Sequence, residues 1–457
     1  MQRERLGSRL GFIMLSAGCA IGIGNVWKFP YIVGQYGGGI FVLIYIIFLI
    51  AIGVPVMTME FAIGRASRKS PVKMYRPLEP PKTKWHLHGY VALAGNYILM
   101  MFYTCVAGWM LNYFVNTATG KFVGLNPEQI KLQYTHMQSD AFMMMIYTSL
   151  VIIIGFAVCS LGLQNGLERI TKIMMILLLA IMVVLAVNSL LITNGREGLK
   201  FYLIPDFEKI KEVGIVNVVV AAMNQAFFTL SLGIGGMAVF GSYIDKKRSL
   251  LGESINVAVL DTFVAFVSGL IVFPACSAYN VEVDSGPTLI FVTLPNIFNN
   301  LPMGRLWGSL FFVFMCFAAL STVFAVFEVI ISSTIDIFNC SRKKACVVNC
   351  IAILILSLPC ILGFNVLSGI KPFGDGSTIM DLEDFIINNL LIPLGSLVIV
   401  LFCVLKKGWG WDNFIKEANS GKGIKIPNKL KGYITFVLPI VISVLFVFGL
   451  YNFFVAS

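Results

Sequence analysis

The chain has 457 residues, of which 58% are hydrophobic and only 12% are charged, and its formal net charge is +11. A water-soluble protein carries about 25% charged residues, so this composition excludes a soluble single-core fold and indicates a membrane protein. Its three histidines and ten scattered cysteines show none of the paired spacings that zinc, haem or iron–sulfur sites require.

Apolar windows of about 20 residues, which is the length that crosses a bilayer, recur along the whole chain. We therefore expect residues 1–457 to form one all-α transmembrane domain that belongs to the plasma (inner) membrane. The windows predict eleven membrane-spanning helices, near residues 10–35, 40–63, 89–116, 140–159, 168–192, 214–243, 253–278, 304–338, 345–367, 379–405 and 431–455.

Basic residues alternate with these spans. With the N-terminus inside the cell, the cytoplasmic segments hold 25 of the 34 Lys and Arg residues, the opposite loops hold 8, and Lys28 lies within a span. The positive-inside rule thus predicts a cytoplasmic N-terminus and, with an odd number of spans, an extracellular C-terminus. The net charge reflects topology and does not indicate nucleic acid. Residues 1–19 also resemble a lipoprotein signal ending at Cys19, but apolar sequence continues to Pro30, so we expect no cleavage.

Glycine interrupts two of the predicted spans. Residues 18–25 read Gly-Cys-Ala-Ile-Gly-Ile-Gly-Asn, and residues 231–236 read Ser-Leu-Gly-Ile-Gly-Gly. Each glycine weakens a helix by about 1 kcal/mol relative to alanine, although small residues also let membrane helices pack closely. Two breaks about two hundred residues apart favour two five-helix inverted repeats with broken first and sixth helices, near 10–192 and 214–405, followed by an extra helix near 431–455.

Ionisable residues inside membrane spans are rare and often functional. Five lie within or at the edge of the predicted spans: Lys28, Glu60, Asp261, Glu328 and Asp384. We expect Glu60 to cap amides freed at a broken helix and Glu328 to bond a neighbouring helix. Asp261 has no basic residue nearby in sequence, which indicates a bound cation as its counter-charge.

Four further motifs read Gly-Ile-Gly-Asn-Val-Trp-Lys-Phe-Pro-Tyr at 22–31, Tyr-Gly-Gly-Gly at 36–39, Gly-Leu-Glu-Arg at 166–169 and Phe-Phe-Thr-Leu-Ser-Leu-Gly at 227–233. Together these motifs resemble those of the neurotransmitter:sodium symporter family. The likeness spans essentially the whole chain, and eleven spans are typical of the bacterial amino-acid transporters of this family, which share the leucine-transporter fold. It implies sodium-coupled symport of an amino acid by alternating access.

The resemblance implies two sodium sites, and oxygen ligands suit such a hard cation. The first would use the substrate carboxylate together with Ala20, Asn25, Thr229 and Asp261. The second would join the first and eighth spans through Gly18, Ile21, Ala318, Ser321 and Thr322. A sodium ion that bridges two helices favours the conformation that holds them together.

The resemblance also implies a substrate site. Monoamine transporters carry aspartate at the position of Gly22, whereas amino-acid transporters carry glycine there, so Gly22 favours an amino acid. The remaining implied residues are Ala20, Gly24, Leu99, Tyr103, Phe228, Ser231, Ile234, Thr322 and Val326. The side-chain walls among them are apolar, which favours a neutral hydrophobic or aromatic substrate, and Gly235-Gly236 favours tyrosine, tryptophan or a large aliphatic residue.

Two gates follow from the same likeness. Phe228 and Tyr103 would form the outer lid with Lys28 facing Asp384, and Arg3 would pair with Asp336 near Tyr243 on the inside. Lys28 replaces the usual arginine and lacks its bidentate fork, so the outer latch is expected to be looser. The family's tryptophan and proline are replaced by Leu6 and Ile176.

Chloride-dependent relatives carry a serine where this chain has Ala265. Because Asp261 supplies a fixed negative charge, we expect no chloride requirement. The apolar loop 284–303 resembles the family's outer re-entrant loop, and a short interfacial helix is the alternative.

Other functions have weaker support. A sodium-dependent amino-acid receptor without net transport is the main alternative, while a channel would need a continuous polar pore. An enzyme is not expected because no catalytic arrangement lies near the breaks. The expected partners are a small amino acid and the lipid bilayer, with neither nucleic acid nor an obligate protein partner.

Overall fold

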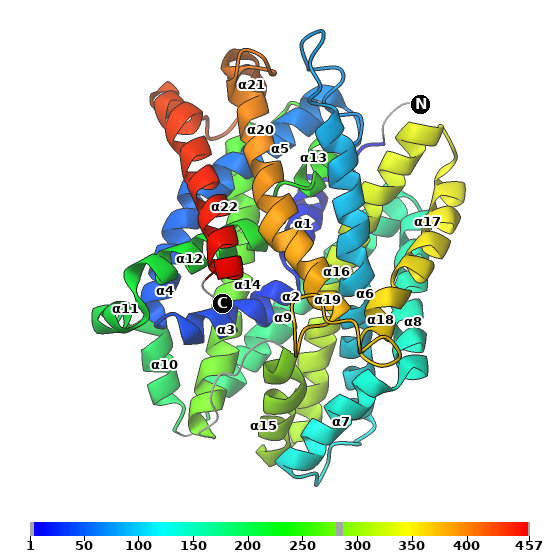
Figure 1. Cartoon of the computed structure of the whole chain (residues 1–457), viewed down its shortest axis with the longest axis vertical. Coiled ribbons are helices and arrows are strands. Elements are labelled where there is room, and N and C mark those ends of the chain that lie inside the picture. The colour runs from blue at the N-terminus through cyan, green and yellow to red at the C-terminus, as the bar shows by residue number, and fades with distance from the viewer. Residues whose placement is uncertain (1–3, 193, 280–286, 456–457) are drawn as a thin grey trace.

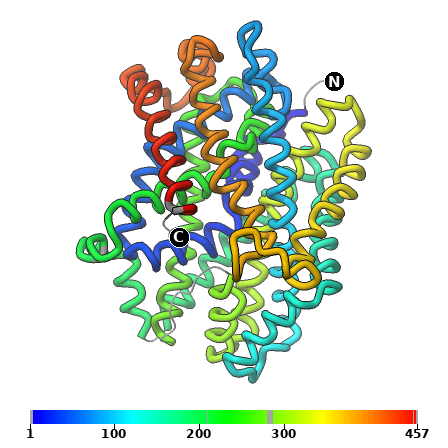
Figure 2. Tube along the Cα trace, viewed as in Figure 1, coloured from blue at the N-terminus to red at the C-terminus, as the bar shows by residue number. Residues whose placement is uncertain are grey.

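A computed structural model describes residues 4–192, 194–279 and 287–455. Its helices form an elongated bundle in which most long helices run along the longest dimension (Figures 1 and 2). The α-helices of the first half are α1 (Arg9–Ala20), α2 (Ile23–Val26), α3 (Lys28–Gln35), α4 (Gly39–Phe48), α5 (Val54–Ser67), α6 (Leu87–Ala118), α7 (Pro127–Ser139), α8 (Ala141–Ser160), α9 (Arg169–Leu190), α10 (Arg196–Leu203) and α11 (Phe207–Val213). Those of the second half are α12 (Ile215–Thr229), α13 (Gly236–Gly241), α14 (Leu250–Ala278), α15 (Leu294–Asn300), α16 (Gly304–Phe338), α17 (Arg342–Leu356), α18 (Leu358–Leu362), α19 (Ile379–Phe385), α20 (Ile392–Val404), α21 (Trp411–Ala418) and α22 (Leu438–Val455).

Several long helices contain wider π-helical turns. These are η1 (Leu49–Gly53), η2 (Leu163–Glu168), η3 (Leu289–Thr293), η4 (Ile386–Leu391) and η6 (Tyr433–Val437), and a 3₁₀ turn, η5 (Asn428–Leu430), precedes the last. In four of them a proline stands two residues after the last residue of the turn, at Pro55, Pro295, Pro393 and Pro439. Proline lacks an N–H donor and its ring crowds the carbonyl four residues earlier, so the preceding turn widens. A widened turn shifts the face that later side chains present, and η4 lies beside the central cavity.

The described residues contain nine continuous helical stretches long and apolar enough to cross a membrane, from Gly39–Ser67 to Asn428–Tyr451. A tenth is the bent pair of α1 with α2 and α3, whose two parts meet at 64°. The short apolar helix α12 and α13 cover the sixth predicted span. The all-helical architecture is therefore confirmed in the described ranges, while the count of eleven spans and the inverted repeats stay predictions.

Central and peripheral helices differ in burial. The most apolar window of α16 is 78% buried, against 28% for Asn428–Tyr451, so α16 is a core helix and the last span lies at the edge. Figure 1 shows α1 in the middle of the bundle and α22 at its side.

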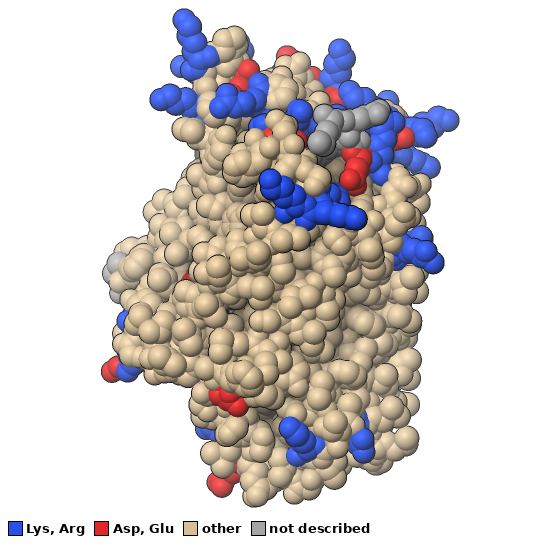
Figure 3. Space-filling model, turned by 90° about the vertical axis from the view of Figure 1, so that its right-hand side faces the viewer, with Lys and Arg blue, Asp and Glu red and all other residues tan. Residues whose placement is uncertain are grey.

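Charged side chains are segregated on the surface. Figure 3 shows Lys and Arg gathered at one end of the molecule, with a broad belt below them that is almost free of charge. That end carries α21 and the N-terminus in Figure 1. An uncharged belt between polar ends is the surface that a bilayer requires.

The apolar loop after α14 packs into the bundle. Residues 280–286 lie outside the described ranges, but Leu289, Ile290 and Phe291 are fully buried. The Phe291 ring stacks on Tyr134 with centroids 5.5 Å apart and meets Trp109 edge-on at 5.7 Å. Burial inside the protein explains its apolar sequence and agrees with the re-entrant interpretation.

Candidate functional site

The first break separates α1 from α2 in the centre of the molecule. Ile21 and Gly22 have extended backbone, so the amides that follow lose their helical partners. The amide of Gly22 donates to Asn25 Oδ1 at 3.2 Å, and that of Ile23 donates to the Tyr103 hydroxyl at 3.1 Å. Side chains thus satisfy the freed backbone at membrane depth, as an apolar environment demands.

The second break lies between α12 and α13. Gly233 has a φ of 86°, a conformation that favours glycine, and a Cβ there would lie 2.3 Å from the carbonyl oxygen of Ile392. Both the backbone conformation and the lack of space therefore require glycine. The Gly233 amide donates to Glu60 Oε1 at 2.5 Å, and Glu60 is fully buried. The prediction that Glu60 caps a broken helix is confirmed.

Three polar side chains converge beside both breaks. Asp261 on α14 is fully buried and accepts from Asn25 Nδ2 at 2.8 Å and from the Thr229 hydroxyl at 2.8 Å. No basic side chain forms an ion pair with Asp261 in the described part of the chain. We call Asn25, Thr229 and Asp261 the carboxylate cluster.

A second group of oxygen atoms joins α1 to α16. The Thr322 hydroxyl lies 3.2 Å from the Gly18 carbonyl oxygen and 3.3 Å from that of Ile21. Ser321 Oγ lies 2.9 Å from the Ala318 oxygen and 3.4 Å from that of Ile21. All five residues predicted for the second sodium site therefore meet, and we call them the helix-bridging cluster.

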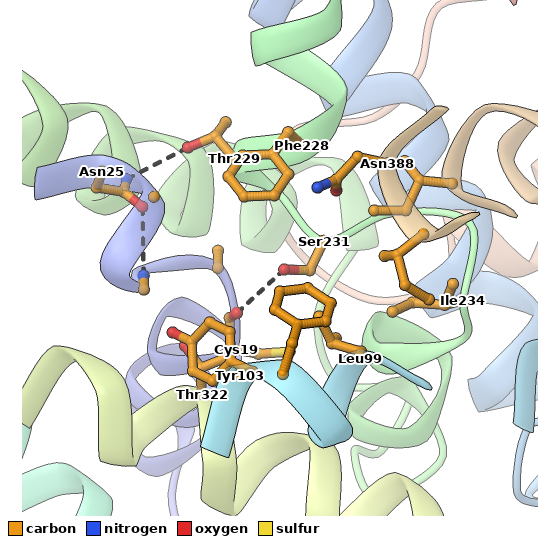
Figure 4. Close-up of a pocket in the computed structure, with 16 residues that line it drawn as sticks. Cys19, Asn25, Leu99, Tyr103, Phe228, Thr229, Ser231, Ile234, Thr322 and Asn388 are labelled. Carbon is orange, nitrogen blue, oxygen red and sulfur yellow. Dashed lines mark hydrogen bonds between the residues drawn. The ribbon is translucent and has the colours of Figure 1, made fainter. Parts of the chain in front are cut away.

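A cavity of about 50 Å³ lies between the two broken helices (Figure 4). Nine of the ten predicted substrate residues line it, and two residues of the carboxylate cluster, Asn25 and Thr229, line it as well. The tenth, Val326, is buried in α16 and is not among the residues that line this cavity. Five lining residues were missed by the sequence analysis: Cys19, Phe102, Ile387, Asn388 and Ile392.

Small residues keep this cavity open. A Cβ at Gly22 would lie 2.7 Å from the Tyr103 hydroxyl and 2.9 Å from Thr322 Oγ1, and one at Gly24 would lie 2.3 Å from the Phe228 ring. The carbonyl of Cys19 accepts from the Ser231 hydroxyl at 3.2 Å (Figure 4). Any larger side chain at Gly22 would fill the space that the cavity offers to a ligand.

A wider cavity of about 260 Å³ lies on the other side of Phe228 and Tyr103, which line both cavities. Lys28 and Asp384 line the wider cavity, as the predicted outer gate requires. In the described part of the chain no ion pair joins them: Lys28 Nζ lies 4.1 Å from the centroid of the Phe228 ring, and Asp384 accepts from Asn388 Nδ2 at 2.5 Å. Lys28 therefore lies over the Phe228 ring and not in an ion pair with Asp384, and the outer gate stays a prediction.

The predicted inner gate is described only in part, because Arg3 lies outside the described residues. Asp336 accepts from the backbone amide of Ser70 at 2.7 Å. Tyr243 donates to Glu328, which also pairs with Arg342 at 2.7 Å. Glu328 thus bonds the neighbouring helix α17 through Arg342, as predicted, and also the turn after α13 through Tyr243.

The segment before α1 is fastened to η2 by a contact that the sequence analysis missed. Glu168 accepts from the amides of Gly7 at 2.7 Å and Ser8 at 3.1 Å, and from the Ser8 hydroxyl at 2.7 Å. Glu4 accepts from the Leu163 amide at 3.1 Å. Glu168 belongs to the Gly-Leu-Glu-Arg motif noted above, so a signal for it was present.

Apolar helices broken at two places around a central cavity, with freed backbone lining that cavity, define a secondary transporter. Comparison with known proteins agrees. The pattern of the sodium:neurotransmitter symporter family matches residues 3–126 and 128–456. The chain belongs to this family and is a sodium-dependent, multi-pass membrane transporter.

Individual relatives show the same extent of likeness. The chain is 34% identical to an uncharacterized sodium-dependent transporter of Bacillus subtilis over 87% of each chain. It is 31% identical to another from Haemophilus influenzae, over 98% of this chain and 99% of the relative. The crystal structure of MhsT in complex with L-phenylalanine is similar with a TM-score of 0.87 and 34% identity, over 97% of this chain and 99% of MhsT.

Proposed function

We propose that the chain carries a neutral hydrophobic or aromatic amino acid into the cell together with sodium, by alternating access. The observation that supports this most is the sharing of residues between the central cavity and the carboxylate cluster. Asn25 and Thr229 line the cavity and also bond Asp261. A ligand carboxylate in the cavity and a cation at the cluster would therefore touch, so each would raise the affinity of the other.

The proposed substrate lies with its α-carboxylate at the first break. The Gly22 to Gly24 amides and the Tyr103 hydroxyl would hold it; the Tyr103 hydroxyl accepts from the Ile23 amide and would donate its hydrogen to the carboxylate. The ammonium group would meet carbonyls near Ala20, Phe228 and Ser231. The remaining walls are largely apolar, and MhsT, a similar structure, binds L-phenylalanine.

The oxygen atoms of both clusters are suitable ligands for sodium. The carboxylate cluster, with the Ala20 carbonyl, supplies oxygen ligands and one full negative charge. The helix-bridging cluster supplies three carbonyl and two hydroxyl oxygens, drawn from Gly18, Ile21, Ala318, Ser321 and Thr322. Hard oxygen ligands of this kind suit a hard cation, and the second set would hold α1 against α16.

Transport is proposed to need no chloride. Asp261 places a fixed negative charge beside the first ion, and Ala265, one helical turn further along α14, is buried and offers no hydroxyl to an anion. We further propose that the end rich in Lys and Arg faces the cytoplasm, which places the N-terminus inside and the C-terminus outside.

Thermal stability of the purified protein against twenty amino acids, each in sodium and in potassium buffer, tests the proposal. Ligands that bind only the folded state raise the midpoint. We expect hydrophobic or aromatic amino acids to raise it in sodium alone, and shifts of equal size in both buffers would contradict a sodium-linked site. Sodium-driven uptake into proteoliposomes then separates a symporter from a receptor, because a receptor would bind without accumulation.

A further inference from the structure

One polar side chain in the central cavity has no place in the proposed binding of the amino-acid backbone. Asn388 lies in the π-helical turn η4 and lines the cavity. Its Oδ1 atom is buried and has no hydrogen-bond partner among the described residues. A buried acceptor without a partner is unfavourable, so this oxygen atom is free to accept a hydrogen bond from a ligand.

The orientation of the Asn388 amide is fixed by its neighbour. Asn388 Nδ2 donates to Asp384 Oδ1 at 2.5 Å, and an ionised carboxylate accepts but cannot donate. The amide nitrogen must therefore face Asp384, which leaves the oxygen for the cavity. Figure 4 shows the amide end of Asn388 directed toward Phe228.

The position of Asn388 matches the side-chain end of the substrate. Figure 4 shows Asn388 and Ile234 on the side of the cavity away from Asn25 and Tyr103, which would hold the α-carboxylate. The surroundings of Asn388 there are apolar, with Ile387 and Ile392 lining the same wall. A single acceptor in an apolar wall discriminates strongly, because a substrate without a donor leaves it unpaired.

We propose that Asn388 is a specificity-determining residue that selects aromatic substrates with a hydrogen-bond donor on the ring, an indole N–H or a phenol O–H. This inference rests on the proposed amino-acid transport and names the substrate class more closely. Because Asn388 also bonds Asp384 at the outer gate, such a donor would hold the amide in the position that keeps Asp384 in place. Phenylalanine and aliphatic residues fit the apolar walls but leave Oδ1 without a partner.

Two pairs of matched ligands test the inference on the unmodified protein. Sodium-dependent affinity is measured for tyrosine against phenylalanine, and for tryptophan against 3-benzothienylalanine, in which sulfur replaces the indole N–H. The donor-bearing member of each pair is expected to bind about tenfold or more tightly. Equal affinities within each pair would overturn the role of Asn388 while leaving the symport proposal intact. Loss of sodium-dependent binding for all four ligands would instead overturn the proposed function.

Two variants test whether Asn388 causes the difference in affinity within each ligand pair. Asn388→Leu, which is similar in volume, should reduce both affinity ratios to about one and keep phenylalanine binding. Asn389→Leu changes the neighbouring asparagine, which does not line the cavity, and should keep the ratios of the unmodified protein. If Asn388→Leu fails to fold, the ligand pairs on the unmodified protein still decide the question. Ratios that persist in a folded Asn388→Leu protein would refute the assignment.

Discussion

Replacing Asp261 with asparagine tests the electrostatic centre of the proposed mechanism. The carboxylate is fully buried and accepts at 2.8 Å from both Asn25 and Thr229. A full charge about 4 Å from a cation contributes about 4 kcal/mol at an effective dielectric constant near 20. Removal of the buried charge also removes its desolvation penalty, so we expect a net loss of about 2–3 kcal/mol. This corresponds to sodium affinity about 30- to 150-fold weaker.

The assay is a sodium titration at saturating substrate, in chloride and in gluconate salts, with thermal stability as the readout. Unmodified protein should respond equally in both. Asp261→Asn should lose affinity in gluconate and recover part of it in chloride, because a mobile anion can then replace the missing charge. Asp412→Asn removes an exposed carboxylate on α21 and should change neither titration. Sodium affinity that stays within threefold of the unmodified protein in gluconate would refute the reasoning.

Three further changes probe the remaining parts of the site. Gly22→Ala should weaken substrate affinity by about 100-fold or more, since its Cβ would lie 2.7 Å from the Tyr103 hydroxyl, and should leave the fold intact. Calorimetric titration measures the affinity, and thermal stabilisation by sodium shows that the fold is retained. Unchanged affinity would contradict the assignment of this cavity as the substrate site. Ser321→Ala with Thr322→Val removes both hydroxyls of the helix-bridging cluster and should raise the sodium concentration for half-maximal uptake about tenfold or more; an unchanged value would exclude an ion there. Glu168→Gln should weaken the bonds to the amides before α1 and speed their hydrogen exchange about tenfold, and unchanged exchange would show that the carboxylate charge does not fasten this segment.

Local sequence was enough for the broken helices. The glycines at 22 and 24 and at 233 cannot continue a helix without cost, and the polar residues beside them mark the places where side chains complete the freed backbone. The helix-bridging cluster could be predicted only from the family likeness. Its five residues come from two segments, at α1 and on α16, that almost three hundred residues separate in the sequence. Hydropathy alone predicts where apolar spans lie along the chain but not which spans are neighbours in the fold.

The direction in which each side chain points from its helix was harder to predict from the sequence. Val326 and Asn388 show opposite errors: the first was predicted to face the cavity and does not, and the second faces it but was not predicted. Asn388 lies in η4, where an added residue in the turn before Pro393 alters the face that each side chain presents. A regular period of 3.6 residues cannot place such a residue. Glu168 lies in the π-helical turn η2, so its contact with the chain before α1 was also outside that pattern.

The two ends of α1 point to a coupling between the proposed second sodium ion and the Glu168 contacts that hold the segment before α1. Its C-terminal carbonyls, at Gly18 and Ile21, belong to the helix-bridging cluster, and the residues before its first turn are fastened to Glu168. Because α1 is one continuous helix of 12 residues, movement of one end away from α16 would also pull on the other end. We therefore expect departure of the second sodium ion to weaken the Glu168 contacts. The reverse follows from thermodynamic reciprocity: a protein that loses the Glu168 contacts should bind that sodium less tightly. Sodium affinity measured in Glu168→Gln decides this, because the affinity would stay unchanged if the two ends of α1 were independent of each other.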